Sequence, residues 1–338
     1  GEVSIGTVTS QLLYEIAGPR YLGPDVSARF DTIELEQVAP DRVRISGVIG
    51  EPPPPTLKVA INELGGYRND VAVALTGLDV EAKAELVEAA FWRACPYGPD
   101  DFATVRTRLI RTDHADPESN EAATAQWRIS VKDPDERKVG RAFSNAVIEL
   151  ALASTPGFYG MSGGPSAASP FGVYRPALVP ADLAPQYVHV AGAGVQVSSV
   201  APTSGSAGTA IASTAVATAP TGPDWIDRTE RAPLGRVVGA RSGDKGGDAN
   251  LGVFARSERG YEWLAWFLTV ERVRDLLPET AALPVERHDL ANLWSLNFVI
   301  RGLLEEGVAA STRIDAQAKS LGEWLRARVV EIPVELLP

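Results

Sequence analysis

Hydrophobic and polar positions in the N-terminal part of the chain alternate in short runs, which predicts strands more often than helices. Residues 7–16 instead carry their apolar side chains at helical spacing, and Gly18-Pro19 ends that pattern. Three alternating runs follow, and each predicts a strand: 30–37, 42–48 and 56–62. The turn Ala39-Pro40-Asp41 separates the first two runs, so we expect a hairpin there.

Residues 70–154 show the order strand, helix, strand, strand, helix. The strands are predicted from alternating runs at 70–75, 105–111 and 125–131. A helix is predicted over 80–93, with Asp79 as its N-cap. A second helix is predicted over 134–154, with Asp133 as its cap and a proline at its first position. This order is close to half of a ferredoxin-like fold.

Residues 183–223 contain no Asp, Glu, Lys or Arg, and from 200 to 221 they are mainly Ala, Ser, Thr and Gly. Such a composition cannot bury enough apolar surface to offset the entropy that is lost on ordering. We therefore predict a flexible linker over 183–231. The stretch before it, 157–185, is rich in glycine and proline and is predicted to be irregular.

The rest of the chain, residues 232–338, predicts a second compact domain. Its expected strands are 234–240, 250–256, 285–289, 309–314 and 328–334. Its expected helices are 261–277, 293–304 and 318–326. The predicted fold class is therefore α+β, with two ferredoxin-like α/β sandwich units, 1–182 and 232–338, joined by the flexible linker.

Charge and cysteine content limit which classes of partner the chain can bind and which cellular compartment it is expected to occupy. The formal net charge is -11 and no run of Lys and Arg occurs, which argues against a nucleic-acid partner. No apolar run is long enough to span a bilayer, so we expect no membrane association. Cys95 is the only cysteine, so no internal disulfide can form, and we expect a cytoplasmic location.

The chain begins at Gly1, and its single methionine is Met161. A newly translated chain starts with Met, and here the first residues run directly into patterned sequence. We therefore expect that an N-terminal segment of a longer polypeptide is missing from this sequence.

The most distinctive segment is rich in glycine and charge and joins two predicted strands. It comprises Arg241, Ser242, Gly243, Asp244, Lys245, Gly246, Gly247, Asp248, Ala249 and Asn250. Its glycines would let backbone N–H groups point inward, and Arg241 and Lys245 add positive charge, which is typical of a phosphate or carboxylate site. Asp244, Asp248 and Asn250 could instead bind a metal, but a glycine interrupts the spacing of a calcium loop, so no metal is predicted. A tight hairpin whose Asp and Asn side chains bond their own backbone is the third interpretation.

Four further residues could support such a site, namely Asn292, Asn297, Arg313 and Lys319. Asn292 is expected to cap the helix 293–304, and Asn297 to lie within it, where its amide needs partners. Arg313 and Lys319 lie on either side of a predicted strand-to-helix turn and could hold an anion or form surface ion pairs. We predict no cofactor and assign no catalytic residue.

Five motifs in this chain are long and specific: 7–16 (TVTSQLLYEI), 18–22 (GPRYL), 50–58 (GEPPPPTLK), 240–250 (ARSGDKGGDAN) and 292–298 (NLWSLNF). They resemble the acyclic terpene utilisation protein AtuA family, the last two its appended ferredoxin-like domain. On this resemblance, 1–182 is the second half of an AtuA-like core domain and 232–338 is the ferredoxin-fold domain. Family members carry an N-terminal α/β half before the equivalent of Gly1, and the resemblance implies that half as a partner, on the same or a separate chain.

The resemblance implies a role in breaking down acyclic terpenes or other branched acids, whose intermediates travel as CoA thioesters. Our leading hypothesis is that the chain is part of a catabolic enzyme that acts on a branched acyl-CoA or related acid. The anionic group of this substrate would lie against residues 241–250. The alternative is a non-catalytic binding or assembly subunit of a larger acyl-CoA-processing complex. In either case we expect a homo-oligomer.

Overall fold

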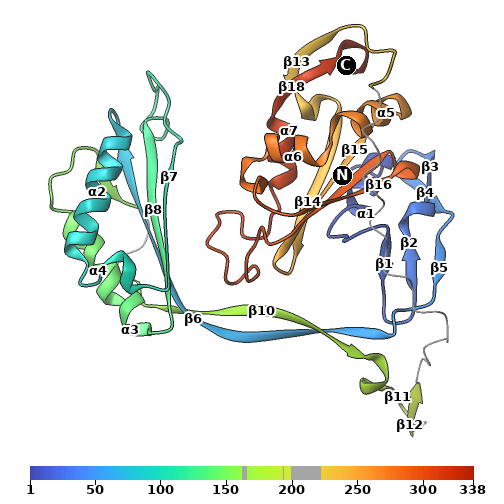
Figure 1. The fold of residues 1–338 in the computed structure, drawn as a ribbon, viewed down its shortest axis with the longest axis horizontal. Helices are drawn as coiled ribbons and strands as arrows, with labels where there is room; N and C mark the ends of the chain where they lie inside the picture. Colours follow the sequence, from blue (N-terminus) through green and yellow to red (C-terminus); the bar gives the residue numbers. More distant parts are fainter. Residues whose placement is uncertain (162–165, 193, 199–221) are drawn as a thin grey trace. The chain divides into compact units, whose positions relative to one another are not determined.

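A computed structural model describes residues 1–161, 166–192, 194–198 and 222–338. They form two compact units: unit 1 comprises Gly1–Ile61 and Tyr174–Pro338, and unit 2 comprises Asn62–Val173. Strands β6 (Thr56–Thr76) and β10 (Ser169–Pro180) pass from one unit to the other (Figure 1). Unit 2 is therefore an insertion into unit 1, and two paired strands connect them.

The compact units divide the chain differently from the sequence patterns, which grouped its first 61 residues with unit 2. These residues pack with the C-terminal part because Leu13 and Ile16 are buried in one apolar cluster with Leu290 and Leu293. The amphipathic pattern of the first helix shows that it needs an apolar surface, but it does not show which one.

Unit 2 is a sandwich of two main helices and one sheet. Its sheet has the order β10-β6-β8-β7, with β9 also paired to β6. The elements after β6 are α2 (Val80–Ala94), β7 (Thr104–Ile110), β8 (Thr124–Asp133), α3 (Glu136–Val139), α4 (Arg141–Leu150) and β9 (Phe158–Gly160). Helices α2 and α4 pack on one face (Figure 1), where the Phe91 ring lies 5.7 Å from that of Trp127 and 5.3 Å from that of Phe143. The order βαββαβ confirms the ferredoxin-like prediction.

Three local predictions for unit 2 are wrong. Asp79 has a left-handed backbone (φ 56°), so its side chain does not cap α2. The next helix starts at Glu136 with Asp135 as its cap, and the chain turns at Gly140 before α4 begins. The stretch predicted to be irregular contains β9 and β10, because pairing with β6 supplies backbone partners that the local sequence does not reveal.

The C-terminal part of unit 1 is a second sandwich. Its strands are β14 (Val238–Lys245), β15 (Asp248–Ala255), β16 (Val285–Leu290) and β17 (Ser295–Ile300), and its helices are α5 (Glu258–Phe267), α6 (Val270–Leu276) and α7 (Leu321–Ala327). The sheet order is β14-β15-β17-β16, and the three helices share one apolar core with it. The strand order matches that of unit 2 with one difference. The edge strand β14 is the first strand of its sheet in the chain, whereas the corresponding edge strand of unit 2, β10, is the last. After α7, β18 (Val329–Pro333) pairs with β13 (Thr229–Pro233) in a separate ribbon.

The predicted helix 293–304 is wrong, because its centre forms β17. This strand lies between β15 and β16 and is buried on both faces, so its sequence (SLNFVI) reads as a continuous run without a period of two. The predicted helix 261–277 is two helices, α5 and α6, and 309–314 forms no strand.

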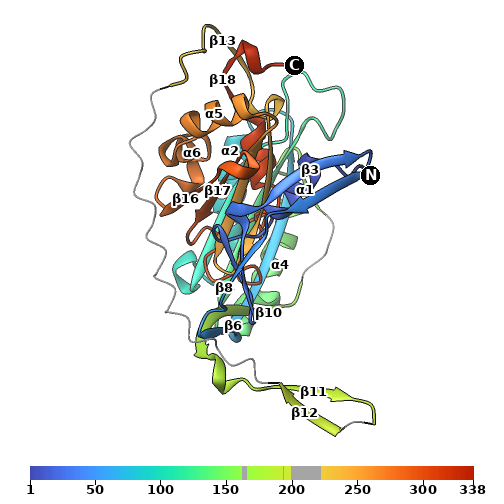
Figure 2. The same ribbon diagram turned by 90° about the vertical axis from the view of Figure 1, so that its right-hand side faces the viewer.

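The N-terminal part of unit 1 is a helix with two small sheets. Ser4 caps α1 (Ile5–Leu12) in a reciprocal box with Thr7. The predicted hairpin is confirmed as β3 (Glu34–Ala39) and β4 (Arg42–Ser46), and α1 lies beside it (Figure 2). The second sheet has the order β1-β2-β5 and comprises β1 (Arg20–Leu22), β2 (Ser27–Arg29) and β5 (Ile49–Glu51).

Both ends of the predicted linker 183–231 contain β-strands. Its start forms an antiparallel hairpin of β11 (Gln186–Val190) and β12 (Gly194–Ser198), and its end enters β13. Valine at alternate positions favours the hairpin, which the low-complexity composition obscured. Residues 199–221, to which the prediction of flexibility mainly applies, lie outside the described residues.

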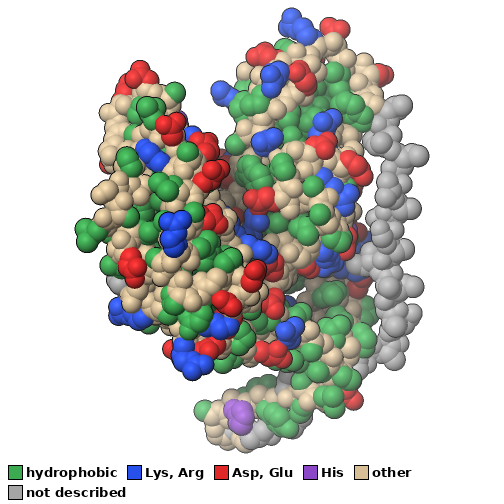
Figure 3. Space-filling model, turned by 60° about the vertical axis from the view of Figure 1, so that its left-hand side comes forward, with side chains coloured by type: hydrophobic (Ala, Val, Ile, Leu, Met, Phe, Trp, Pro, Cys, Tyr) green, Lys and Arg blue, Asp and Glu red, His purple; other side chains and the backbone are tan. Residues whose placement is uncertain are grey.

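Within the described ranges, no helix is both long and apolar enough to cross a bilayer. Figure 3 shows acidic, basic and apolar side chains mixed over the face that it draws. The net charge of -11 is therefore not gathered into one acidic area on that face.

We expect Phe298→Ala to destabilise the C-terminal sandwich by about 3–5 kcal/mol, because it empties a fully buried site in β17. Urea unfolding followed by tryptophan fluorescence measures this. The control is Ile314→Ala, whose side chain is 63% exposed and which should change stability by no more than about 0.5 kcal/mol. Equal effects of the two variants would contradict the burial of Phe298 in the core of the sandwich.

Candidate functional site

Two buried asparagines attach the segment after α1 to the sheet of unit 1. Asn250 Nδ2 donates to Leu13 O at 2.9 Å and to Asn297 Oδ1 at 2.6 Å. Asn250 Oδ1 accepts from the Glu15 N–H at 2.8 Å, and Asn297 Nδ2 donates to Ile16 O at 3.4 Å. Both amides are fully buried, so these bonds satisfy backbone groups that water does not reach.

Two glycines let this segment lie directly against the strands. A Cβ on Gly252 would come within 2.6 Å of the Leu13 Cβ, and a Cβ on Gly243 within 2.7 Å of the Glu15 Cγ. Any larger side chain at either position would push the segment away from the sheet. Gly243 of the 241–250 motif and the nearby Gly252 therefore serve close packing of the N-terminal segment.

Two cations lie against the ring of Tyr14. The Arg241 guanidinium lies 4.4 Å from the ring centroid, and the Lys319 ammonium lies 4.5 Å from it. Lys319 Nζ also donates to the Tyr14 hydroxyl and to Glu15 Oε1. Cations over an aromatic face are stabilised by the ring quadrupole, so Tyr14 organises both charges.

Glu15 and Lys319 form the charged centre of this cluster, with Asp244 Oδ1 3.2 Å from Lys319 Nζ. Burial acts to raise the pKa of Glu15, but the hydrogen bond and charge of Lys319 outweigh it, and the pKa lies below its ordinary value. Burial acts to lower the pKa of Lys319, but its bonds to the carboxylates raise it above its ordinary value. Both groups therefore stay charged near neutral pH.

Lys245 differs from the other cations of the cluster. Its side chain is half-buried, and within the described parts of the chain it forms no ion pair. Burial and the nearby charge of Lys58 lower the pKa of Lys245, and the attraction of Glu15 and Asp244 does not offset them. A desolvated amine beside a second amine is an arrangement that favours a bound anion.

The motif itself is a tight β-hairpin and not an open loop. Lys245 pairs with Asp248 across a two-residue turn, in which Gly246 has a φ of 69°. Asp248 accepts from Arg301 at 2.7 Å and from the Gly302 N–H at 2.8 Å, so its carboxylate is already used. The hairpin interpretation therefore describes the backbone, in which residues 241–245 pair with residues 248–252.

The other residues that were predicted for the site have separate structural roles. The buried Ser242 Oγ accepts from the Gly322 N–H at 2.9 Å. Asn292 donates to two backbone carbonyls, Phe30 O at 2.9 Å and Ile33 O at 2.8 Å, so it fixes the N-terminal part instead of capping a helix. Arg313 pairs with Glu279. Asn297 lies in β17, with the partners given above.

The sequence analysis did not assign Tyr14, Glu15 or Lys58 to the site. Tyr14 and Glu15 follow the last turn of α1, and Glu15 has a left-handed backbone (φ 58°). A polar pair just after an amphipathic helix and before Gly18-Pro19 is a weak signal, and nothing in it points to the distant hairpin. Only tertiary structure brings these residues together.

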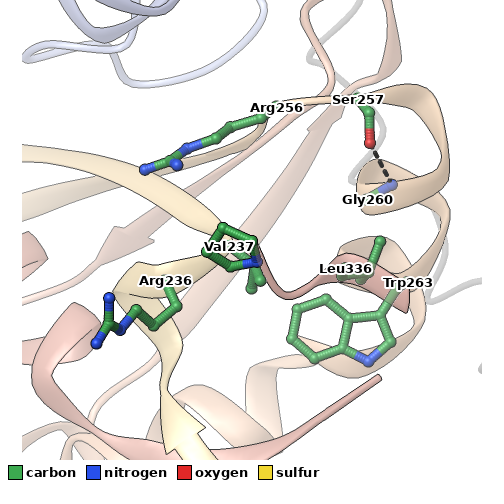
Figure 4. A pocket seen from close by; sticks show the side chains of 8 residues that line it. Arg236, Val237, Arg256, Ser257, Gly260, Trp263 and Leu336 are labelled. Carbon is green, nitrogen blue, oxygen red and sulfur yellow. Dashed lines mark hydrogen bonds between the residues drawn. The ribbon is translucent and has the colours of Figure 1, made fainter. Parts of the chain in front are cut away.

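The described part of unit 1 also holds a small pocket of about 180 Å³ at the start of α5 (Figure 4). It is lined by Arg236, Val237, Arg256, Ser257, Gly260, Trp263, Leu336 and Pro338. The Ser257 hydroxyl accepts from the Gly260 N–H at 3.1 Å, which is an ordinary helix cap. The pocket is smaller than the roughly 300–1,000 Å³ of typical ligand sites and contains no residue of the cluster around Tyr14.

The family model described as acyclic terpene utilisation family protein AtuA matches residues 1–190, and the family model of the AtuA ferredoxin-like domain matches residues 232–331. No curated protein and no solved structure matches the chain. Tyr14, Glu15 and Lys58 fall in the first matched region, whereas Arg241, Lys245 and Lys319 fall in the second. The site is therefore assembled from both matched regions.

We expect Asn250→Ala to cost about 2–4 kcal/mol of stability, because it leaves Leu13 O and the Glu15 N–H buried without partners. Asn292→Ala is the matched control: it also removes two backbone bonds, but at an exposed position where water replaces them, so it should cost about 1 kcal/mol or less. Chemical denaturation of the two variants measures the difference, and similar costs would show that the buried amide does not fix the segment.

Proposed function

The chain belongs to the acyclic terpene utilisation family AtuA, and on that premise we propose that it takes part in acyclic terpene catabolism by binding an anionic intermediate at Lys245. The ligand would be a branched acid or its CoA thioester. In this proposal the chain is part of a catabolic enzyme, and the cluster around Tyr14 holds the anionic group of the substrate.

Lys245 is the observation that carries the proposal. A half-buried ammonium beside Lys58 is costly while no anion offsets the two charges, and an anion bound there removes that cost. The other cations have partners, since Arg241 lies on Tyr14 and Lys319 pairs with Glu15 and Asp244. Lys245 and Lys58 are the cations of this cluster best placed to receive a ligand.

The electrostatics of the cluster favour binding over proton transfer by its acidic groups. Efficient acid–base catalysis needs a pKa close to the working pH, but the pKa of Glu15 is lowered and that of Lys319 is raised. The pKa of Lys245, in contrast, is lowered toward neutrality. If a proton is exchanged in this cluster, we infer that Lys245 exchanges it.

One observation supports the alternative of an assembly subunit. The small sheets of unit 1 expose several large apolar side chains: Tyr21, Leu22, Val26, Ile45, Val48 and Ile49. Scattered apolar side chains are normal on a surface, but several on adjoining strands favour contact with a second chain. A homo-oligomer formed through these strands is compatible with ligand binding at Lys245.

Lys245→Met should weaken binding of an acyclic terpenoid acid, such as geranic acid, by roughly 10- to 100-fold, because it removes a charged hydrogen-bond donor. The same variant should be at least as stable as the wild type at neutral pH. The folded-state pKa of Lys245 lies below the unfolded value, so its charge destabilises the fold fully below that lowered pKa, and the penalty disappears as the pH rises from there to the ordinary value of 10.5. Isothermal titration calorimetry and thermal unfolding measure the two effects.

The pH dependence provides the control. Affinity of the wild type should fall as the pH rises through the lowered pKa of Lys245, below the 10.5 that is ordinary for lysine. Lys245→Arg keeps its charge in this range, so it should bind without that decline. An unchanged affinity in Lys245→Met, or the same decline in Lys245→Arg, would remove Lys245 from the binding site.

If the apolar strands mediate assembly, Leu22→Ser with Ile49→Ser should reduce the molar mass in light scattering by whole subunits. The control is Leu152→Ser in unit 2, where the side chain is 92% exposed and the change should leave the mass unaltered. A wild-type protein that is monomeric at high concentration would exclude this interface.

A further inference from the structure

The pocket at the start of α5 lies at the open end of the hairpin that β14 and β15 form. Val238 pairs with Ala255 at this end, and the chain beyond the pair carries Arg236 on one side and Arg256 on the other. Both arginines line the pocket, and their side chains extend in the same direction, to the left in Figure 4. The strand register therefore brings together two cations that are separated in the sequence.

The other wall of the pocket is apolar. Trp263 is 1% exposed and shares the core of the C-terminal sandwich with Val237. Leu336, in the turn Val334–Leu336 that follows β18, packs against the same core. In Figure 4 the Trp263 indole and the Leu336 side chain lie on the side away from the two guanidinium groups. The pocket thus has a charged side and an apolar side.

The two arginines of the pocket have no partner in the part of the chain that the structure describes. Arg236 and Arg256 form no hydrogen bond, ion pair or ring contact with another described residue. Other arginines of the same sandwich do form such contacts. The Arg259 guanidinium lies 4.6 Å from the centroid of the Trp225 ring, and that of Arg326 donates to two backbone carbonyls. The N–H groups of the two pocket arginines are therefore available to a ligand.

Acidic side chains do not neutralise the charged side of the pocket. Among the described residues that line it, none is acidic, although the whole chain has a net charge of -11. The nearest acids along the chain, Glu258 and Glu335, are exposed, and neither forms an ion pair with a described residue. Exposed carboxylates are solvated and gain little from such a pair. An anion in the pocket therefore meets the two guanidinium groups without a competing carboxylate in the lining.

The volume and the lining of the pocket define a class of ligand. About 180 Å³ accommodates about six groups of the size of a water molecule, at roughly 30 Å³ each. Arginine binds a carboxylate through two parallel N–H···O bonds, and an apolar wall favours a hydrocarbon or aromatic body. A free phosphate would bind the arginines but would leave Trp263 and Leu336 without a contact. A small carboxylic acid satisfies both sides of the pocket.

We propose that this pocket binds a small monocarboxylate, with its carboxylate between Arg236 and Arg256 and its apolar body against Trp263. The site goes beyond the proposed function, because its ligand is smaller than a terpenoid acid and none of its residues belongs to the cluster around Tyr14. A bound acid contacts the hairpin end, α5 and the turn after β18 at once. Binding therefore stabilises the folded C-terminal sandwich.

The test is a ligand-detected NMR titration of the full chain with benzoate and with benzamide, its neutral counterpart. It uses Lys245→Met, so that the other proposed anion site does not contribute. We expect benzoate to bind with a Kd of about 1 mM and benzamide at least about tenfold more weakly, because the amide carries no charge. The double variant Arg236→Gln, Arg256→Gln should weaken benzoate binding at least about tenfold. Acetate should bind more weakly than benzoate, because it leaves the apolar wall uncovered.

The matched control is Arg328→Gln. Arg328 is an exposed arginine of the same sandwich whose side chain has no partner among the described residues, and it lies outside the pocket, so this variant should bind benzoate normally. Equal affinity for benzoate and benzamide, equal affinity in the double variant and in Arg328→Gln, or tighter binding of inorganic phosphate than of benzoate would overturn the proposal.

Geranic acid separates this proposal from the proposed function. The double variant at Arg236 and Arg256 should bind geranic acid like the wild type, because that ligand is assigned to Lys245. If Lys245→Met abolishes benzoate binding, the pocket is not the carboxylate site and only the present proposal fails. If Lys245→Met leaves geranic acid binding unchanged while benzoate still depends on the two arginines, only the proposed function fails.

Discussion

The buried amide of Asn250 is the constraint on which the arrangement of unit 1 depends. It satisfies the carbonyl of Leu13 and the amide of Glu15 at once, in a place where water cannot replace it. A buried polar group of this kind tolerates one geometry, so it selects the position of the segment to within a hydrogen-bond length. Apolar packing of Leu13 and Ile16 alone would allow the segment to slide along the sheet.

That attachment explains how a charged cluster is built from distant parts of the chain. Once the backbone of residues 13–16 is fixed, the left-handed Glu15 turns its carboxylate toward Lys319, and the Tyr14 ring contacts both Lys319 and Arg241. Such a backbone persists in a residue other than glycine only when its surroundings over-determine it. The strain at Glu15 is therefore balanced by the bonds that Asn250 and Lys319 form with it.

The elements that the sequence predicts correctly are those that interactions between neighbouring residues determine. The hairpin of β3 and β4 and the helix α2 follow from turn residues and periodicity, and the structure has both. Strand β17 was missed because burial on both faces removes the alternation that identifies a strand. The residue types of the hairpin at 241–250 were recognised as unusual, but the partners at Tyr14 and Glu15 were not. Contacts between residues more than 200 positions apart leave no periodic signal.

The same limit applies to charge. The sequence contains no run of Lys and Arg, yet Arg241 and Lys319 come from separate segments and both lie against the ring of Tyr14. A net charge of -11 does not prevent such a cluster from attracting anions. Charges more than about 8–10 Å away are largely screened at physiological ionic strength, so the nearest side chains decide which ions bind. The half-buried Lys245 beside Lys58 is therefore costly while no anion is near, and an anion that offsets this cost would bind the folded chain and stabilise it.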